Sequence, residues 1–192
     1  MTTIAYKQGI MACDSQATAG DTIVSYKQKK IYKVNGHLIG CAGRLSECIA
    51  FVDYFRKLMV VQEARQNGVP MDSLPPFEAE NFMAIVVDPE REVSIFEGGN
   101  DIIPAEDPVA IGSGGVYATA AMKAGADAKR AVEIAIEMDV FSGGDVQVVE
   151  VDRYLEELEI DELVDIAKSE GLKPTKKMSK EDLITLIMGS DD

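Results

Sequence analysis

A threonine follows the initiator methionine of this chain, which begins Met1-Thr2-Thr3-Ile4-Ala5. Methionine ahead of a small residue is readily removed, and its removal leaves Thr2 with a free α-amine beside its own hydroxyl. A hydroxyl is a poor nucleophile at neutral pH, and an N-terminal amine is one of the bases that activate threonine. Such an amine titrates at about 7.7–8.0, and at physiological pH its unprotonated fraction can accept a proton. Thr2 is therefore a candidate nucleophile, and the alternative is an ordinary first strand.

Other nucleophiles and ligands have few candidate residues in this sequence. The three cysteines, Cys13, Cys41 and Cys48, are an odd number without metal-type spacing, which favours small apolar core residues in a reducing compartment. His37 is the only histidine, so a Ser-His-Asp site would have one candidate base. Because His37 follows an Asn35-Gly36 turn signal, we expect an exposed turn residue there. No metal site is expected.

The composition is that of an acidic globular protein. A length of 192 residues with 46% hydrophobic residues suits one core and a small appendage. The net charge of −14 disfavours binding to nucleic acid or to an anionic membrane, because both require a basic surface. No apolar run approaches the ~18 residues of a membrane span, and no signal peptide precedes Thr2. We therefore expect a cytoplasmic protein.

The hydrophobic pattern predicts stacked antiparallel sheets covered by helices. Strands are expected over residues 3–7, 9–13, 31–34, 37–41, 82–88, 92–97, 109–111 and 145–151. Apolar residues at helical spacing predict helices over residues 45–66, 116–125 and 127–139. Asp14 and the Lys29-Lys30 pair are expected on strand-like stretches.

The character of the sequence changes near Asp152, which predicts one domain over residues 1–152 and a second over residues 153–192. The second segment is rich in acidic residues and has two short stretches with helical apolar spacing. Gly171 suits the C-terminal cap of the first helix, and Pro174 follows it as a stop. Ser179-Lys180-Glu181-Asp182 has the form of a capping box that opens the second helix.

Six short sequence blocks occur in order along the first domain. They are Thr2-Thr3-Ile4-Ala5, Asp14-Ser15-Gln16-Ala17-Thr18-Ala19-Gly20, Lys29-Lys30-Ile31, Ala42-Gly43, Ile111-Gly112-Ser113-Gly114-Gly115 and Asp139-Val140-Phe141-Ser142-Gly143-Gly144. In type and order they resemble the proteasome β-subunits and the related bacterial HslV-type peptidases, which are N-terminal-nucleophile hydrolases. The last block is closer to the proteasome type, and the direct Met1-Thr2 start is closer to the HslV type. This resemblance implies an α+β fold, a four-layer α/β/β/α sandwich.

The same resemblance implies roles for four residues. Thr2 Oγ would be the nucleophile and its α-amine the proton acceptor, directly or through water. Asp14 and Lys30 would pair near Thr2, where the cation favours the neutral amine and the developing alkoxide. The alternative for this pair is a structural ion pair. Gly43 would donate its N–H to the oxyanion, a contribution of roughly 3–4 kcal/mol in comparable sites.

Further residues are implied around the amine and along the substrate. Ser113, Asp139 and Ser142 would hydrogen-bond around the Thr2 amine, and for the two serines the alternative is a turn or cap hydroxyl. Thr18 would pair with the backbone of an extended peptide, as a sheet edge does.

The first specificity pocket would be lined by Ala17, Cys41 and Leu45, with Lys30 at its floor. Because these lining side chains are small or apolar, an apolar residue is expected before the cleaved bond. Arg44, at the neighbouring position, could change this preference.

The resemblance implies a threonine endopeptidase whose sites face the lumen of homo-oligomeric stacked rings and cleave unfolded polypeptides. No cofactor is expected. A separate ATP-dependent unfoldase is expected as a partner, because this chain contains no phosphate-loop sequence. One alternative is a catalytically silent ring or interaction protein of the same fold. Another is an amidase of the same hydrolase class.

The C-terminal segment resembles helix–extended-loop–helix modules of the LEM/SAP kind, from Ile160 to Ile184. Some such modules bind DNA, and four lysines lie on or beside the loop: Lys173, Lys176, Lys177 and Lys180. The surrounding acidic residues argue against general phosphate binding. Binding of a protein partner or recruitment of substrate is therefore favoured over DNA binding.

Overall fold

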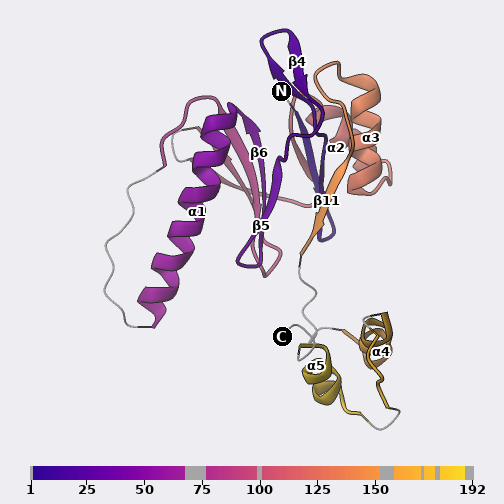
Figure 1. Ribbon diagram of the computed structural model, residues 1–192. Coiled ribbons are helices and arrows are strands. Elements are labelled where there is room, and N and C mark those ends of the chain that lie inside the picture. The colour runs from indigo at the N-terminus through magenta and orange to yellow at the C-terminus, as the bar shows by residue number, and fades with distance from the viewer. Residues whose placement is uncertain are drawn as a thin grey trace. The chain divides into compact units, whose positions relative to one another are not determined.

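The computed structural model describes residues 2–67, 77–98, 101–151, 158–169, 171–175 and 178–188 (Figure 1). The chain forms two compact units, Met1–Val151 and Asp152–Asp192. Within the described ranges, no helix is both long enough and apolar enough to cross a membrane.

The first sheet has the order β10-β1-β2-β11, and every neighbouring pair is antiparallel. Its strands are β1 Thr3–Lys7, β2 Ile10–Cys13, β10 Val109–Gly112 and β11 Gln147–Glu150. A tight turn joins β1 to β2, with Gln8 at φ 50° and Gly9 at φ 83°. Because Ile4 pairs with Cys13, Thr2 just before β1 and Asp14 just after β2 lie at the same end of this hairpin.

The second sheet has the order β5-β6-β7-β8-β9. Its strands are β5 Ile31–Val34, β6 His37–Gly43, β7 Phe82–Val87, β8 Val93–Glu97 and β9 Asp101–Ala105. The predicted Asn35-Gly36 turn is confirmed, with φ values of 48° and 77°. Positive φ at both central residues is the geometry of a type I′ turn, whose twist matches that of the flanking strands.

The two sheets face each other across a shared hydrophobic core. Strands of both contribute fully buried side chains to it, such as Ile4, Met11, Leu38 and Ile85. Fully burying a side chain of this kind contributes about 1.5–3 kcal/mol. Because side chains alternate along a strand, Ile4 faces this core while Ala5 faces the other side of the first sheet.

Helices cover the outer faces of both sheets (Figure 1). Helix α1 (Leu45–Gln66) lies on the second sheet through a buried aromatic cluster, in which the Phe51 and Phe82 ring centroids are 4.7 Å apart. Helices α2 (Gly115–Lys123) and α3 (Ala128–Met138) cover the first sheet through small side chains. The layers are therefore α1, second sheet, first sheet and α2–α3, which confirms the expected four-layer α/β/β/α sandwich.

Two elements were absent from the sequence-based prediction. One is the hairpin of β3 (Ala17–Ala19) and β4 (Thr22–Ser25), and the other is the edge strand β9, which contains Pro104. Both are short and largely exposed, so they lack the apolar alternation that marks a half-buried strand.

The expectation that Asp14 and Lys30 lie within strands was also wrong. Asp14 directly follows β2 and Lys30 directly precedes β5. Just beyond β2 the Gln16 N–H donates to the Asp14 side chain instead of to a neighbouring strand.

The C-terminal unit contains α4 (Ile160–Ser169) and α5 (Lys180–Met188), which share a small core. Its buried members are Leu163, Ala167, Leu183 and Ile187. Among the four lysines of the expected loop region, Lys173 is exposed, Lys180 begins α5, and the remaining two, at positions 176 and 177, lie outside the described residues.

Both predicted caps of the C-terminal unit are confirmed. Gly171 has φ 78°, and the Leu172 N–H donates to the Ala167 carbonyl at 2.9 Å, as in a Schellman motif. At the start of α5, the Ser179 N–H donates to Asp182 at 2.9 Å while the Asp182 N–H donates to the Ser179 hydroxyl at 3.2 Å.

Candidate active site

A single carboxylate oxygen holds the candidate nucleophile and the candidate cation together. The Thr2 hydroxyl donates to Asp14 Oδ1 at 2.6 Å, and the Lys30 ammonium donates to the same oxygen at 2.7 Å. Thr2 is 3% exposed, Lys30 7% and Asp14 0%. The structure therefore brings these three residues together at the shared end of the two sheets.

Three backbone N–H groups complete the environment of Asp14. Thr3 donates to Oδ1 at 2.9 Å, while Gln16 and Gly143 donate to Oδ2 at 3.1 and 3.0 Å. A buried charge is tolerated when it is paired and hydrogen-bonded. With five donors, the Asp14 carboxylate meets both conditions and is fixed in orientation.

The Lys30 ammonium lies in a buried, partly compensated environment. Burial lowers the pKa of Lys30, and the ion pair and hydrogen bond with Asp14 oppose that change. The ammonium is thus held near Thr2 by Asp14.

A second hydrogen-bond network surrounds Asp139, just beyond the end of α3. Ser113 and Ser142 both donate to Asp139 Oδ2 at 2.7 Å, and the Phe141 N–H donates to Oδ1 at 3.2 Å. Burial alone would raise the pKa of Asp139, but these hydrogen bonds outweigh it and lower the pKa. The Ser113 hydroxyl also lies 3.4 Å from the Thr2 carbonyl oxygen, so this network reaches Thr2.

Gly43 ends β6, and it lines the same cavities as Thr2. It has φ 122°, and a Cβ at this position would collide with the carbonyl oxygen of Asn81. Both observations require glycine, because other residues rarely adopt this φ and no space exists for a side chain.

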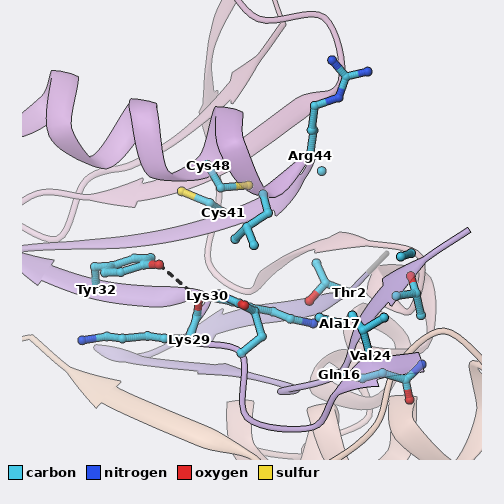
Figure 2. Close-up of a pocket in the computed structure, with 15 residues that line it drawn as sticks. Thr2, Gln16, Ala17, Val24, Lys29, Lys30, Tyr32, Cys41, Arg44 and Cys48 are labelled. Atoms are coloured by element: carbon cyan, nitrogen blue, oxygen red, sulfur yellow. Dashed lines mark hydrogen bonds between the residues drawn. The ribbon is translucent and has the colours of Figure 1, made fainter. Parts of the chain in front are cut away.

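Two cavities meet at Thr2 and Gly43. One has a volume of about 380 Å³ and is lined by every residue expected in the first specificity pocket (Figure 2). Its lining comprises Thr2, Gln16, Ala17, Thr18, Ala19, Val24, Gln28, Lys29, Lys30, Tyr32, Cys41, Gly43, Arg44, Leu45 and Cys48. The other cavity has a volume of about 460 Å³. Besides Thr2 and Gly43, its lining includes Ser113, Glu80 and Glu97. Thr2 thus lies between two hollows that can receive the two sides of a chain.

Several residues that shape the site were missed in the sequence. Tyr32 and Cys48 line the first cavity, and Thr3 and Gln16 bind Asp14 through backbone N–H groups. Tyr32 of β5 lies two residues after Lys30, so alternation along a strand predicts that both are on the same face. Cys48 lies three residues after Leu45, so helical spacing predicts that these two share a face of α1. Backbone donors have no signature in residue type.

The cysteines and the histidine do not form a second site. All three cysteines are free and buried, and burial raises the pKa of Cys13 to about 12. The His37 ring packs on Phe55 with centroids 5.2 Å apart, so His37 is only partly exposed, contrary to the expectation of an exposed turn residue. Among the described residues, no three metal-ligating side chains gather in one place.

A helix-covered double sheet with a buried threonine at the start of its first strand defines the class of N-terminal-nucleophile hydrolases. The sequence model of the family described as "Proteasome subunit" matches residues 2–151. The chain belongs to this family and is a threonine-type peptidase of the N-terminal-nucleophile class.

Curated relatives agree with this assignment. The ATP-dependent protease subunit HslV of Lacticaseibacillus casei is 32% identical over 173 residues, spanning 77% of this chain and 98% of the relative. The protein of the same name from Pseudothermotoga lettingae is 27% identical, over 74% of this chain and 90% of the relative.

Solved structures share the fold. Thiobacillus denitrificans BPH in complex with epoxomicin has a TM-score of 0.55 at 23% identity, over 79% of this chain and 98% of that chain. The eukaryotic HslV from Trypanosoma brucei has a TM-score of 0.53 at 26% identity, over 78% and 98%.

Proposed function

We propose that this protein is the peptidase subunit of a ring-shaped protease, which hydrolyses unfolded polypeptides with Thr2 as nucleophile after removal of Met1. One observation carries the proposal. The Thr2 hydroxyl and the Lys30 ammonium share Asp14 Oδ1 at 2.6 and 2.7 Å, at the meeting point of two cavities.

The first chemical step is attack of Thr2 Oγ on the carbonyl carbon of the scissile peptide bond. The hydroxyl proton passes to the α-amine of Thr2, directly or through one water molecule. With Met1 attached, the Thr2 nitrogen is an amide and accepts no proton, so removal of Met1 is required. The Lys30 cation favours both the neutral amine and the negative charge that develops on Oγ.

The second step is collapse of the tetrahedral intermediate. The Gly43 N–H donates a hydrogen bond to the oxyanion of this intermediate. The positive φ of Gly43 gives the backbone a conformation that other residues rarely adopt, which supports a special role for this N–H. The Thr2 ammonium returns its proton to the leaving amine, which leaves an ester on Oγ. Water, deprotonated by the same amine, then hydrolyses the ester.

The cavity of about 380 Å³ is proposed to hold the side chain before the cleaved bond. Ala17, Cys41 and Leu45 give it apolar walls, and Tyr32 adds an aromatic surface (Figure 2). In Figure 2 the Arg44 guanidinium points away from this cavity, so Arg44 does not add its charge to the pocket. We therefore propose an apolar preference before the cleaved bond, with Thr18 pairing to the peptide backbone.

Ring assembly and an ATPase partner are proposed from the relatives. Those proteins are named as subunits of an ATP-dependent protease, whereas this chain has no phosphate-loop sequence of its own. A separate unfoldase would deliver unfolded chains, and enclosure in a ring would keep the sites from folded proteins.

The test is hydrolysis of apolar fluorogenic peptides by wild-type protein, with intact mass measured in parallel. Thr2→Ala should abolish turnover and leave assembly intact, because it removes only the hydroxyl and a methyl group. A peptidyl epoxyketone should add to wild-type protein that lacks Met1, because that electrophile requires both the hydroxyl and the amine. Turnover by Thr2→Ala, or adduct formation on protein that retains Met1, would refute the mechanism.

Residues 153–192 are proposed to form a separate module that recruits protein substrates to a peptidase domain of residues 1–152. The C-terminal unit has its own buried core and its own helix caps, which supports an independent role. A chain ending at Asp152 should keep short-peptide turnover and lose degradation of protein substrates. Loss of assembly by sedimentation would instead identify the segment as an assembly element.

A further inference from the structure

The hydroxyl of Thr3 is a buried group that the reaction described above does not use. Thr3 is 0% exposed on β1, and its Oγ1 lies 2.7 Å from Ser142 Oγ. A buried hydroxyl without a partner costs about 1–3 kcal/mol, so this contact satisfies a real requirement.

The direction of this hydrogen bond follows from counting protons. Ser142 has one hydroxyl proton, which it donates to Asp139 Oδ2 at 2.7 Å. Its oxygen can therefore only accept from Thr3, and the chain of donors runs from Thr3 through Ser142 to Asp139. Such chains polarise each member and strengthen the hydrogen bonds along them.

The backbone of Thr3 is also fixed, by the other network. Its N–H donates to Asp14 Oδ1 at 2.9 Å, and its carbonyl accepts from the Asp14 N–H at 3.1 Å. Thr3 is thus held at three points, which restrains the plane of the peptide bond that joins it to Thr2. The Thr2 nitrogen turns by rotation about the Thr2 Cα–C bond, which is limited because this peptide plane is fixed and the Thr2 hydroxyl is bound to Asp14.

The neighbouring loop is shaped around the same hydroxyl. A Cβ on Gly114 would collide with Thr3 Oγ1, so glycine at this position leaves the space that the hydroxyl occupies. The Thr3 side chain, Ser142 and the loop before α2 therefore pack as one unit beside the nucleophile.

We propose that Thr3 is a positioning residue of the peptidase. Its hydroxyl is connected through Ser142, Asp139 and Ser113 to the Thr2 carbonyl, its N–H is bound to Asp14, and together these contacts orient Thr2. This inference rests on the proposed function. It assigns to the second threonine a part in turnover rather than only in the stability of β1.

The test compares Thr3→Val, which keeps the shape and removes the hydroxyl, with Thr3→Ser, which keeps the hydroxyl and removes a methyl group. Thr3→Val should lower kcat about 10-fold with KM within twofold of wild type, the effect of one lost hydrogen bond of this kind. Thr3→Ser should retain kcat within about twofold. Thr119→Val, a half-buried change on α2, is the matched control and should behave as wild type.

Kinetic constants should be divided by the fraction of sites that an epoxyketone labels, so that unfolded or untrimmed protein does not count. A wild-type kcat in Thr3→Val, or equal losses in Thr3→Val and Thr3→Ser, would overturn the positioning role. Absence of turnover in the wild type would instead overturn the proposed function, and the positioning role with it.

Discussion

Replacing Lys30 by methionine removes one charge from the centre of the site while keeping most of the side-chain volume. The Lys30 ammonium and the Thr2 hydroxyl lie 2.7 and 2.6 Å from Asp14 Oδ1, so they are at most 5.3 Å apart. At that separation and an effective dielectric constant of about 20, a cation stabilises a unit negative charge by about 3 kcal/mol. Lys30→Met should therefore lower kcat roughly 100-fold.

The same substitution should also destabilise the protein. It leaves Asp14 buried without its counter-charge, and breaking a buried pair in this way typically costs about 3–5 kcal/mol. Because Thr2 and three backbone N–H groups still bind Asp14, we expect the lower end of this range. A loss of about 3 kcal/mol corresponds to a Tm lower by roughly 6–12 °C for a chain of this size.

The assay is peptide turnover well below the Tm of each variant, scaled to the epoxyketone-reactive fraction. Lys27→Met is the matched control, since Lys27 is exposed and should tolerate loss of its charge. The double variant Asp14→Asn/Lys30→Met removes both charges of this pair, so it should regain part of the stability without regaining turnover. If Lys30→Met keeps turnover within about threefold of wild type, the pair is structural and the role given to Asp14 fails as well.

Three further outcomes follow from the same geometry. Turnover should rise with pH through neutrality, because only the unprotonated Thr2 amine is a base; its apparent pKa should lie near or below the free-amine value of about 7.7–8.0, as a nearby cation disfavours protonation. A pH profile that is flat from acid to alkaline would exclude an amine base. Gly43→Ala should lower both Tm and kcat, because its Cβ would collide with the Asn81 carbonyl; unchanged calorimetry and kinetics would contradict this close packing. Protein shown by mass spectrometry to retain Met1 should be inactive, and full activity in it would refute Thr2 as base.

Much of the fold was predictable because its strongest signals are local. The Asn35-Gly36 turn requires positive φ at two successive residues, and helix α1 spans the residues expected from its apolar spacing. Hairpin β3–β4 gave no such signal. Ile23 and Val24 on β4 are 43% and 61% exposed, so this strand lacks the alternation of buried apolar and exposed polar residues that marks a strand in a sequence.

The site could be predicted only in part, for a different reason. Residue spacing does not place Asp14 near Lys30, since 16 positions separate them and the intervening hairpin is irregular; only the ordered sequence blocks pointed to the pair. The N–H groups that bind Asp14 belong to Thr3, Gln16 and Gly143, and any residue type except proline could supply them. The catalytic roles of all these residues stay predictions until the variants are measured.

The arrangement of contacts also bears on how such a peptidase is switched on. Asp14 binds Thr2 through the hydroxyl and Thr3 through its N–H, and neither contact involves the Thr2 nitrogen. Removal of Met1 would therefore create the base without disturbing the atoms that already hold the nucleophile and the cation. The chemistry would then depend on one covalent event at the N-terminus rather than on a rearrangement of the site. In that case trimmed and untrimmed protein should share the same stability from Asp14 and Lys30 and differ only in the presence of an amine that can accept a proton.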